Sequence, residues 1–166
     1  YFVASEHISR WKRAYKWLQY VFEPIMRYKG TVASSTVLEV LRKIRSGANV
    51  CIFAEGGRCW DGVTQPILPS TGKLVQKAGC ALVTYKITGG YFVSPNWSEK
   101  GTRRGHVRGE VVRVYSKETL ARMSVAEINA AIARDLHEDA YARQVKAPKK
   151  YRGKQLAYRM ENLAYL

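Results

Sequence analysis

Apolar residues recur along this chain at two spacings, which together predict alternating strands and helices. Short apolar runs at 1–5, 49–54 and 81–88 are typical of strands. Apolar positions three and four apart predict three helices between these runs. Their ranges are 8–22, about 34–46 and 70–78. The order of these elements predicts an α/β fold class with a largely parallel or mixed central sheet flanked by helices.

Three turn signals bound these predicted helices. Pro24 ends the first, because proline disfavours the helical conformation in the residue before it. Ser34 or Ser35 is a candidate N-cap for the second, which Gly47 closes. Gly79 is placed to end the third. We therefore expect compact helices with short connections to the strands.

The second half of the chain predicts one more strand and a helical tail. The valine-rich run at 111–115 follows an irregular, glycine-rich stretch and suggests a strand at a sheet edge. Ser124 and Glu127 have capping-box spacing, so we expect a helix from there to about Arg143. A basic linker over 146–153 and a last helix over 154–166 would follow. The predicted domains are a core over 1–120 and a helical C-terminal extension over 121–166.

Composition changes the picture mainly through charge. With 28 Lys and Arg against 13 Asp and Glu, the net charge of the 166 residues is +15. Such a balance favours phosphorylated ligands, polyanions or an anionic membrane surface as partners. The cysteines, Cys51, Cys59 and Cys80, have no Cys-x-x-Cys spacing, which favours a reducing, cytoplasmic environment. We read Cys51 and Cys80 as small buried hydrophobes, and expect no metal or cofactor.

A run of eight residues at 51–58 carries the candidate chemistry. Its apolar first half delivers Glu55, Gly56, Gly57 and Arg58 to one turn. The glycines let the backbone approach a ligand, and the planar arginine fork can make two charge-assisted hydrogen bonds to one phosphate group. Glu55 could clamp Arg58 or accept a ligand hydroxyl. The alternative is an ordinary strand and turn with a surface ion pair.

The sequence around this turn resembles the glycerolipid acyltransferases, most closely the 1-acylglycerol-3-phosphate acyltransferase family. Residues 53–59, Phe-Ala-Glu-Gly-Gly-Arg-Cys, resemble the family signature Phe-Pro-Glu-Gly-Thr-Arg-Ser. The run at 24–27, Pro-Ile-Met-Arg, resembles an earlier family block, and Ser70-Thr71-Gly72 with its following helix resembles the Phe-Lys-x-Gly block. The strand at 80–85 occupies the place of the family's Val-Pro-Ile-Val-Pro-Val, with Ala81 and Thr84 replacing prolines.

The resemblance implies transfer of a fatty acyl group from a thioester, acyl-CoA or acyl carrier protein, to a lysophospholipid acceptor. Arg27 and Arg58 would hold the acceptor phosphate, with Glu55, Gly56 and Gly57 shaping the pocket. It also implies a peripheral location on the inner face of the membrane. The family's catalytic His-x-x-x-x-Asp is missing, since the residues five after the histidines are Lys12, Val111 and Ala142. We therefore expect the chain to lack its catalytic base and to start downstream of it.

Two further readings stay open. The helix over 8–22 is basic and aromatic, so it could either pack on the sheet or lie on a membrane. The high positive charge would also suit a nucleic-acid-binding module, with Trp97 or Tyr151 stacking on bases and nearby cations contacting phosphates. Those cations are Arg103, Arg104, Lys149, Lys150 and Arg152. No nucleic-acid motif supports this alternative, and a non-catalytic lipid-binding protein is a third possibility. The three histidines are expected at the surface.

Overall fold

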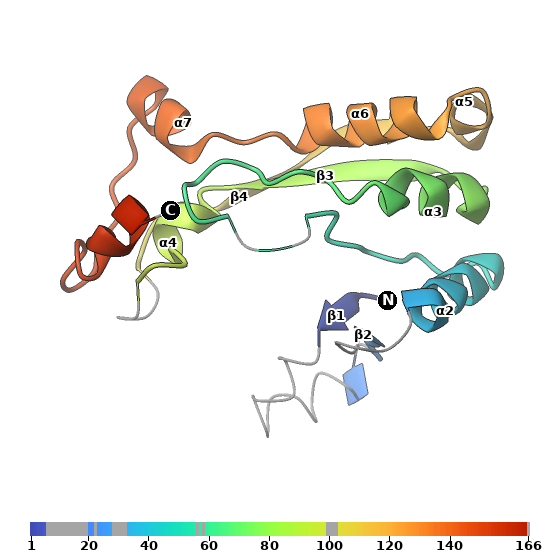
Figure 1. The fold of residues 1–166 in the computed structure, drawn as a ribbon, viewed down its shortest axis with the longest axis horizontal. Coiled ribbons are helices and arrows are strands. Elements are labelled where there is room, and N and C mark those ends of the chain that lie inside the picture. Colours follow the sequence, from blue (N-terminus) through green and yellow to red (C-terminus); the bar gives the residue numbers. More distant parts are fainter. Residues whose placement is uncertain are drawn as a thin grey trace.

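A computed structural model describes residues 1–5, 20–21, 23–27, 33–55, 57, 59–98 and 103–165. The elements of the first half are β1 (Val3–Ser5), β2 (Ile25–Arg27), α2 (Ala33–Arg45), α3 (Ser70–Ala78) and β3 (Leu82–Thr88). Those of the second half are α4 (Gly90–Val93), β4 (Arg108–Tyr115), α5 (Lys117–Ala121), α6 (Val125–Leu136), α7 (Ala140–Lys146) and a 3₁₀ helix (Met160–Tyr165). Figure 1 shows α6 lying along one face of β3 and β4.

The strands form two separate two-stranded sheets among the described residues. β1 pairs with β2 in parallel, and β3 pairs with β4 antiparallel. A single parallel bridge joins Phe2 to Cys51, so the 51 segment lies beside β1 on the side away from β2. The predicted mixture of helices and strands is confirmed, whereas a continuous parallel central sheet is not. The long pair closes antiparallel because β4 returns directly alongside β3 instead of crossing over through a helix.

The segment over 49–54 departs from the predicted buried strand. It makes isolated bridges at Cys51 and Glu55 but no ladder, and the Phe53 side chain is 68% exposed. Cys51 is exposed and Cys80 is only partly buried, so our reading of both as buried hydrophobes is wrong. An apolar run is buried only where other elements pair with it and cover it, and among the described residues little covers this segment.

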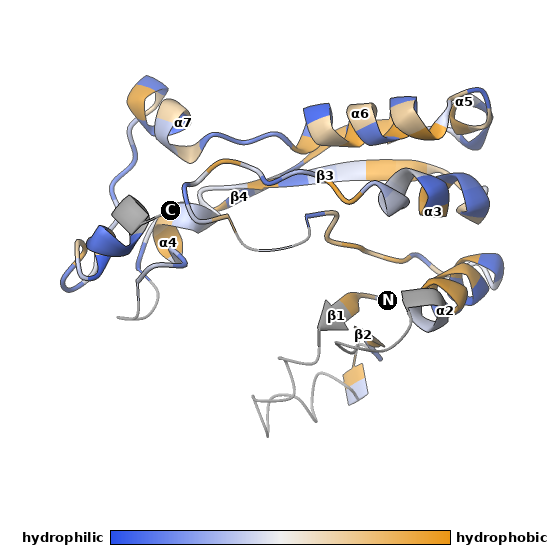
Figure 2. Cartoon of the chain, viewed as in Figure 1, coloured by the Kyte–Doolittle hydropathy of each residue, from blue (hydrophilic) through white to orange (hydrophobic). Residues whose placement is uncertain are grey.

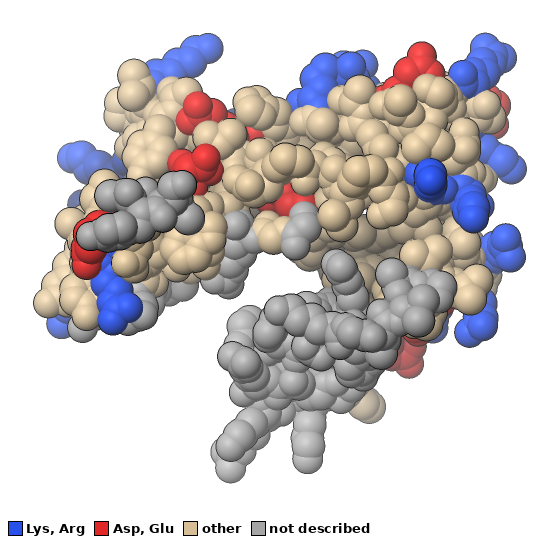
Figure 3. Space-filling model, in the orientation of Figure 1, with Lys and Arg blue, Asp and Glu red and all other residues tan. Residues whose placement is uncertain are grey.

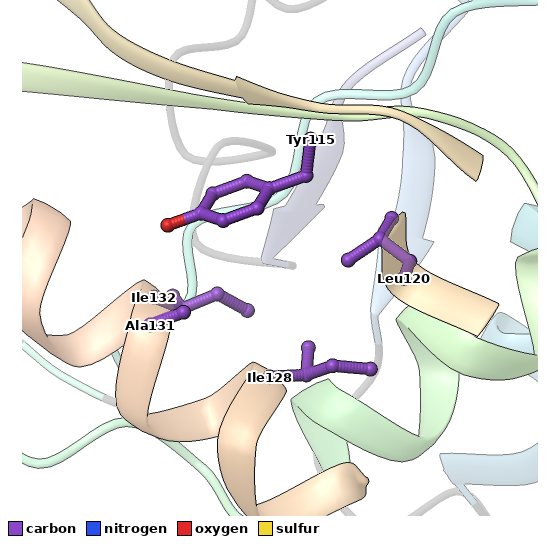
Figure 4. Packing of buried hydrophobic residues seen from close by; sticks show 5 residues of the cluster. All are labelled: Tyr115, Leu120, Ile128, Ala131 and Ile132. Atoms are coloured by element: carbon purple, nitrogen blue, oxygen red, sulfur yellow. The ribbon is translucent and has the colours of Figure 1, made fainter. Parts of the chain in front are cut away.

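The main core lies between α6 and the β3–β4 pair. Tyr115 from β4, Leu120 from α5 and Ile128, Ala131 and Ile132 from α6 form one buried cluster (Figure 4). The apolar residues of α6 recur at helical spacing, and Figure 2 shows apolar and hydrophilic bands alternating along this helix. Three of these five residues belong to α6, so this helix supplies most of the buried cluster against the antiparallel pair.

The predicted bounds of α3 and the predicted end of α2 are confirmed, whereas α2 begins at Ala33, so Ser34 and Ser35 lie within the helix and the predicted N-cap is wrong. Gly47 and Gly79 follow these helices with positive φ angles of 84° and 58°, the left-handed conformation that glycine adopts most easily. The capping box of Ser124 and Glu127 is present at the start of α6. The helix predicted over 8–22 lies almost entirely outside the described residues, although Tyr20 and Val21 are helical.

The predicted C-terminal helices differ from those observed. The helix expected to reach Arg143 ends at Leu136, and α7 starts after Asp139, whose carboxylate accepts a hydrogen bond from the Ala142 N–H. An aspartate that caps a new helix competes with continuation of the old one. The helix expected over 154–166 is a 3₁₀ helix confined to Met160–Tyr165. In the part of the chain that the structure describes, no helix is both long and apolar enough to cross a bilayer.

Candidate functional site

Glu55 closes a loop immediately after the apolar run. Its Oε1 accepts a hydrogen bond from the Gln65 N–H at 2.9 Å, and Glu55 pairs with Ile67 through an antiparallel bridge. Burial raises the pKa of the Glu55 carboxyl, and the hydrogen bond from Gln65 partly offsets that effect. The glutamate therefore has a structural task that the sequence did not predict. Among the described residues nothing donates to its other oxygen.

The loop between Glu55 and Gln65 turns sharply at an Asp-Gly pair. Asp61 Oδ1 accepts from the Val63 N–H at 3.0 Å, and Gly62 has φ +81°. A Cβ at Gly62 would lie 3.0 Å from the Tyr91 ring and 3.2 Å from the Ala140 Cβ, so the turn is packed closely against α4 and α7. The Asp-Gly dipeptide is a turn signal that sequence reasoning could have used here.

Two contacts fix the far side of this loop. Thr64 exchanges hydrogen bonds with Glu138, its N–H donating at 2.9 Å to the Glu138 carbonyl and its Oγ1 accepting from the Glu138 N–H at 2.7 Å. Tyr91 donates from its hydroxyl to the Trp60 carbonyl at 2.8 Å, and Trp97 Nε1 donates to the Tyr91 oxygen at 3.0 Å. Burial raises the pKa of Tyr91, so its hydroxyl stays protonated as a donor. The loop is therefore rigid from 60 to 65.

The predicted site residues can be placed only in part. Gly57 lies in a bend, and a Cβ added there would meet no atom of the described residues within 4 Å. Gly56 and Arg58 lie outside the described residues. The Arg27 backbone ends β2, but its side chain is outside what is described, so the predicted Arg27–Arg58 pair at one phosphate stays a prediction.

The cysteine, histidine and acidic side chains among the described residues limit the reactions that this loop can support. The half-buried Cys59 thiol has its pKa raised, first by burial and then by the negative charge of Glu55, so it is held as a thiol and is a poor nucleophile. His106 and His137 are exposed, as expected, and His7 lies outside the described residues. The described residues include no group of three His, Cys, Asp or Glu side chains placed to hold a metal ion.

Comparison with known proteins gives one informative result. No protein-family model and no curated protein matches the chain. Among solved structures, the 1-acyl-sn-glycerophosphate (LPA) acyltransferase of Thermotoga maritima matches with a TM-score of 0.66 at 18% sequence identity. The fold is glycerolipid acyltransferase-like. The match covers 88% of this chain but 56% of the Thermotoga chain, so the present residues span little more than half of that acyltransferase.

Proposed function

We propose that this chain supplies the acceptor-binding part of an acyltransferase that moves a fatty acyl group from a thioester donor to a lysophosphatidate-like acceptor. The observation that carries the proposal is the agreement between a sequence signature and a fold. The sequence around Glu55 and Arg58 resembles the glycerolipid acyltransferase signature, and the fold is similar to that of an LPA acyltransferase at only 18% identity.

The physical roles follow from the residue types. Arg58, with Arg27, would hold the acceptor phosphate through charge-assisted hydrogen bonds, which suit a dianionic group. Glu55 would keep the turn closed through Gln65 while its second oxygen accepts the glycerol hydroxyl. A neutral alcohol is a poor nucleophile until a base removes its proton, and no His-x-x-x-x-Asp motif occurs in these 166 residues. Acyl transfer by these residues alone should therefore be undetectable, while acceptor binding should persist.

The basic surface suggests where such a protein would work. In Figure 3, Lys and Arg side chains gather at the right-hand end, over α2, α3 and α5, and others lie at the left-hand end. A positive surface of this kind is attracted to anionic headgroups on the cytoplasmic leaflet. We propose a peripheral location at that membrane face, where a lysophospholipid acceptor is presented, with acyl-CoA or acyl carrier protein as donor.

The test is binding of the acceptor to Arg58 variants. Arg58→Ala should weaken binding of lysophosphatidate by roughly 10- to 150-fold, because losing a charged hydrogen bond costs roughly 1.5–3 kcal/mol. Arg58→Lys should recover part of this loss, since lysine keeps the charge but not the planar fork. Calorimetric titration of lysophosphatidate and of the phosphate-free monoacylglycerol measures both effects.

The monoacylglycerol is the control ligand and Lys73→Ala, at an exposed position of α3, is the control variant. Monoacylglycerol binding should not change when Arg58 is replaced, and Lys73→Ala should not weaken lysophosphatidate binding. Equal weakening for the ligands with and without phosphate would place Arg58 outside the phosphate site and remove the main support for the proposal.

A further inference from the structure

A basic groove of about 460 Å³ lies between the segment at 104–106, which follows α4, and the chain at 148–152, which follows α7. The lining residues are Arg104, Gly105, His106, Pro148, Lys149, Lys150 and Arg152. Four of them carry permanent positive charge and none is acidic. The groove is therefore a concentrated positive site, separate from the Glu55 loop.

Two of these arginines are held directly opposite each other. Arg104 and Arg152 form an antiparallel bridge, with N–H to carbonyl distances of 2.8 and 2.7 Å in the two directions. Like charges at opposed positions of paired strands are destabilising. Across the described ranges, no ion pair joins Arg104, Lys149, Lys150 or Arg152 to a carboxylate. A bound anion would relieve this repulsion.

The backbone that carries these cations is fixed by packing. Gly105 lies so close to Tyr151 that an added Cβ would come within 2.2 Å of its ring, and the Tyr151 ring is 5.2 Å from that of Phe92. The Gln144 side chain donates to the Lys149 carbonyl at 2.6 Å and accepts from its N–H at 3.1 Å. The backbone positions of these cations are therefore held in place by packing and hydrogen bonds.

We propose that this groove binds the diphosphate group of a small ligand, a nucleoside diphosphate or a similar molecule. A lipid headgroup phosphodiester brings one charge per molecule, whereas a diphosphate gathers several charges within the span of one groove. Nucleic acid fits less well, because Trp97, one of the two rings expected to stack on bases, is only 4% exposed. The inference does not depend on the proposed acyl transfer, although coenzyme A carries such a diphosphate.

The test is calorimetric titration of the whole chain with ADP and with inorganic phosphate at physiological salt. ADP should bind at least about tenfold more tightly than phosphate, because several charged hydrogen bonds form at once. Arg104→Gln with Arg152→Gln should weaken ADP binding about tenfold or more. The control pair, Lys73→Gln with Lys77→Gln on the exposed face of α3, makes the same change in net charge and should leave ADP affinity within about twofold.

A conservative pair protects the test against a folding defect. Arg104→Lys with Arg152→Lys keeps the charge and should weaken ADP binding severalfold, because lysine lacks the bidentate fork. Thermal melting of every variant checks that each is folded. If the glutamine variants at Arg104 and Arg152 lose no more ADP affinity than those at Lys73 and Lys77, ADP responds only to net charge and the proposal is overturned. Undetectable ADP binding to the parent chain would also overturn it.

A second arm separates other sources of phosphate. Cosedimentation with phosphatidylglycerol–phosphatidylcholine vesicles and titration with a short RNA use the same variants. If the groove pair abolishes vesicle or RNA binding but leaves ADP affinity unchanged, the surface serves a membrane or nucleic acid and the diphosphate site is refuted. Lysophosphatidate binding should not respond to the groove variants, so failure here leaves the test at Arg58 independent.

Discussion

At the scale of single residues, Glu55 shows how a side chain of the candidate site can also hold a loop closed. Its half-buried carboxylate accepts the Gln65 N–H, and the pKa of Glu55 is raised because burial disfavours the charged form. A glutamate whose role was only to face solvent would have neither property. The loop that follows is held at Trp60 and Thr64 by contacts to distant segments. The site is thus fixed on both sides of the residues that carry the resemblance.

The raised pKa of Glu55 predicts a specific dependence of stability on pH. A carboxyl with a raised folded-state pKa contributes stability below its unfolded-state pKa, and loses that contribution as pH rises through the folded value. Glu55→Gln cannot ionise. Relative to the parent chain, Glu55→Gln should therefore be more stable at about pH 7 than at about pH 4, with a larger free energy of unfolding. Urea denaturation at the two pH values measures this difference.

Glu118 provides a control of opposite sign. Its pKa is lowered, first by its own backbone N–H and then by Ser116, at the start of α5. Glu118→Gln should therefore lose stability relative to the parent chain as pH rises over the same range. Parallel pH responses of the two variants would contradict the assignment of Glu55 as a carboxyl penalised by burial.

At the scale of elements, the packing of α3 on α6 explains why position 72, in the block that resembles the family's Phe-Lys-x-Gly, is a glycine. The first turn of α3 packs on α6 so closely that a Cβ at Gly72 would lie 2.6 Å from the Val125 carbonyl oxygen and 2.9 Å from Asn129 Oδ1. Asn129 in turn accepts the Gly72 N–H at 2.8 Å and donates to the Pro69 carbonyl at 2.9 Å. The glycine is required for contact between two helices rather than for a ligand.

Gly72→Ala should destabilise the fold by about 1–3 kcal/mol, because the clash is partly with backbone that cannot move without shifting α6. Gly90→Ala is the control, since a Cβ there would meet nothing within 4 Å and alanine favours helix. Chemical denaturation of the two variants tests the difference. A Gly72→Ala variant as stable as Gly90→Ala would show that α3 and α6 do not pack in this way.

A buried polar cluster attaches α6 to both strands of the antiparallel pair. Asp135, 4% exposed, accepts hydrogen bonds from Tyr115 at 2.7 Å and from Thr84 at 3.0 Å. Arg134 lies 3.5 Å from its other oxygen and donates to the Tyr115 hydroxyl at 3.2 Å. The Tyr115 hydroxyl therefore depends on Asp135 as its acceptor, whereas the Thr84 hydroxyl also lies 3.2 Å from the Arg113 carbonyl. The buried carboxylate is compensated by several donors.

This network predicts strong coupling between two substitutions. Tyr115→Phe should cost about 1.5–3 kcal/mol, the value of a hydrogen bond to a charged group, but little in an Asp135→Ala background where the acceptor is already absent. A double-mutant cycle by urea denaturation measures the coupling. Tyr85→Phe is the control, because Tyr85 lies exposed on the neighbouring strand. Additive effects of Tyr115→Phe and Asp135→Ala would rule out the direct hydrogen bond.

Sequence periodicity predicted the elements with local signals and missed those that depend on tertiary contact. The glycines after α2 and α3 and the capping box of α6 are encoded within a few residues, so their positions could be read directly. The apolar run at 51–54 gives no information on which strands pair beside it, and Phe53 is exposed. Likewise the bond from Glu55 to Gln65 joins groups whose approach only the folded loop decides. Arg58 was singled out by the glycine turn that carries it and by the family resemblance, and it lies outside the described residues.

At the scale of the whole molecule, the net charge of +15 makes binding to any polyanion at low salt uninformative. The exposed side of the β3–β4 pair adds apolar surface, including Val83, Tyr85, Ile87 and Val114, each more than half exposed. Apolar contact with a bilayer is little screened by salt, whereas attraction to nucleic-acid phosphates falls steeply as salt rises. Salt dependence therefore separates the proposed membrane location from the nucleic-acid alternative.

We expect residual binding to anionic vesicles at about 0.3 M salt, where the Debye length is well below the roughly 8 Å of physiological conditions, and near-complete loss of RNA or duplex DNA binding. Cosedimentation and fluorescence anisotropy across a salt series measure the two. Trp11 and Trp17 lie outside the described residues, and the sequence predicts them on the candidate membrane helix. Their replacement by Ser should lower the residual vesicle binding. Val83→Ser with Val114→Ser reports any contribution from the sheet face. Nucleic-acid binding that persists at high salt, with vesicle binding lost, would favour the nucleic-acid module over the acyltransferase, because only specific contacts survive once the phosphate attraction is screened.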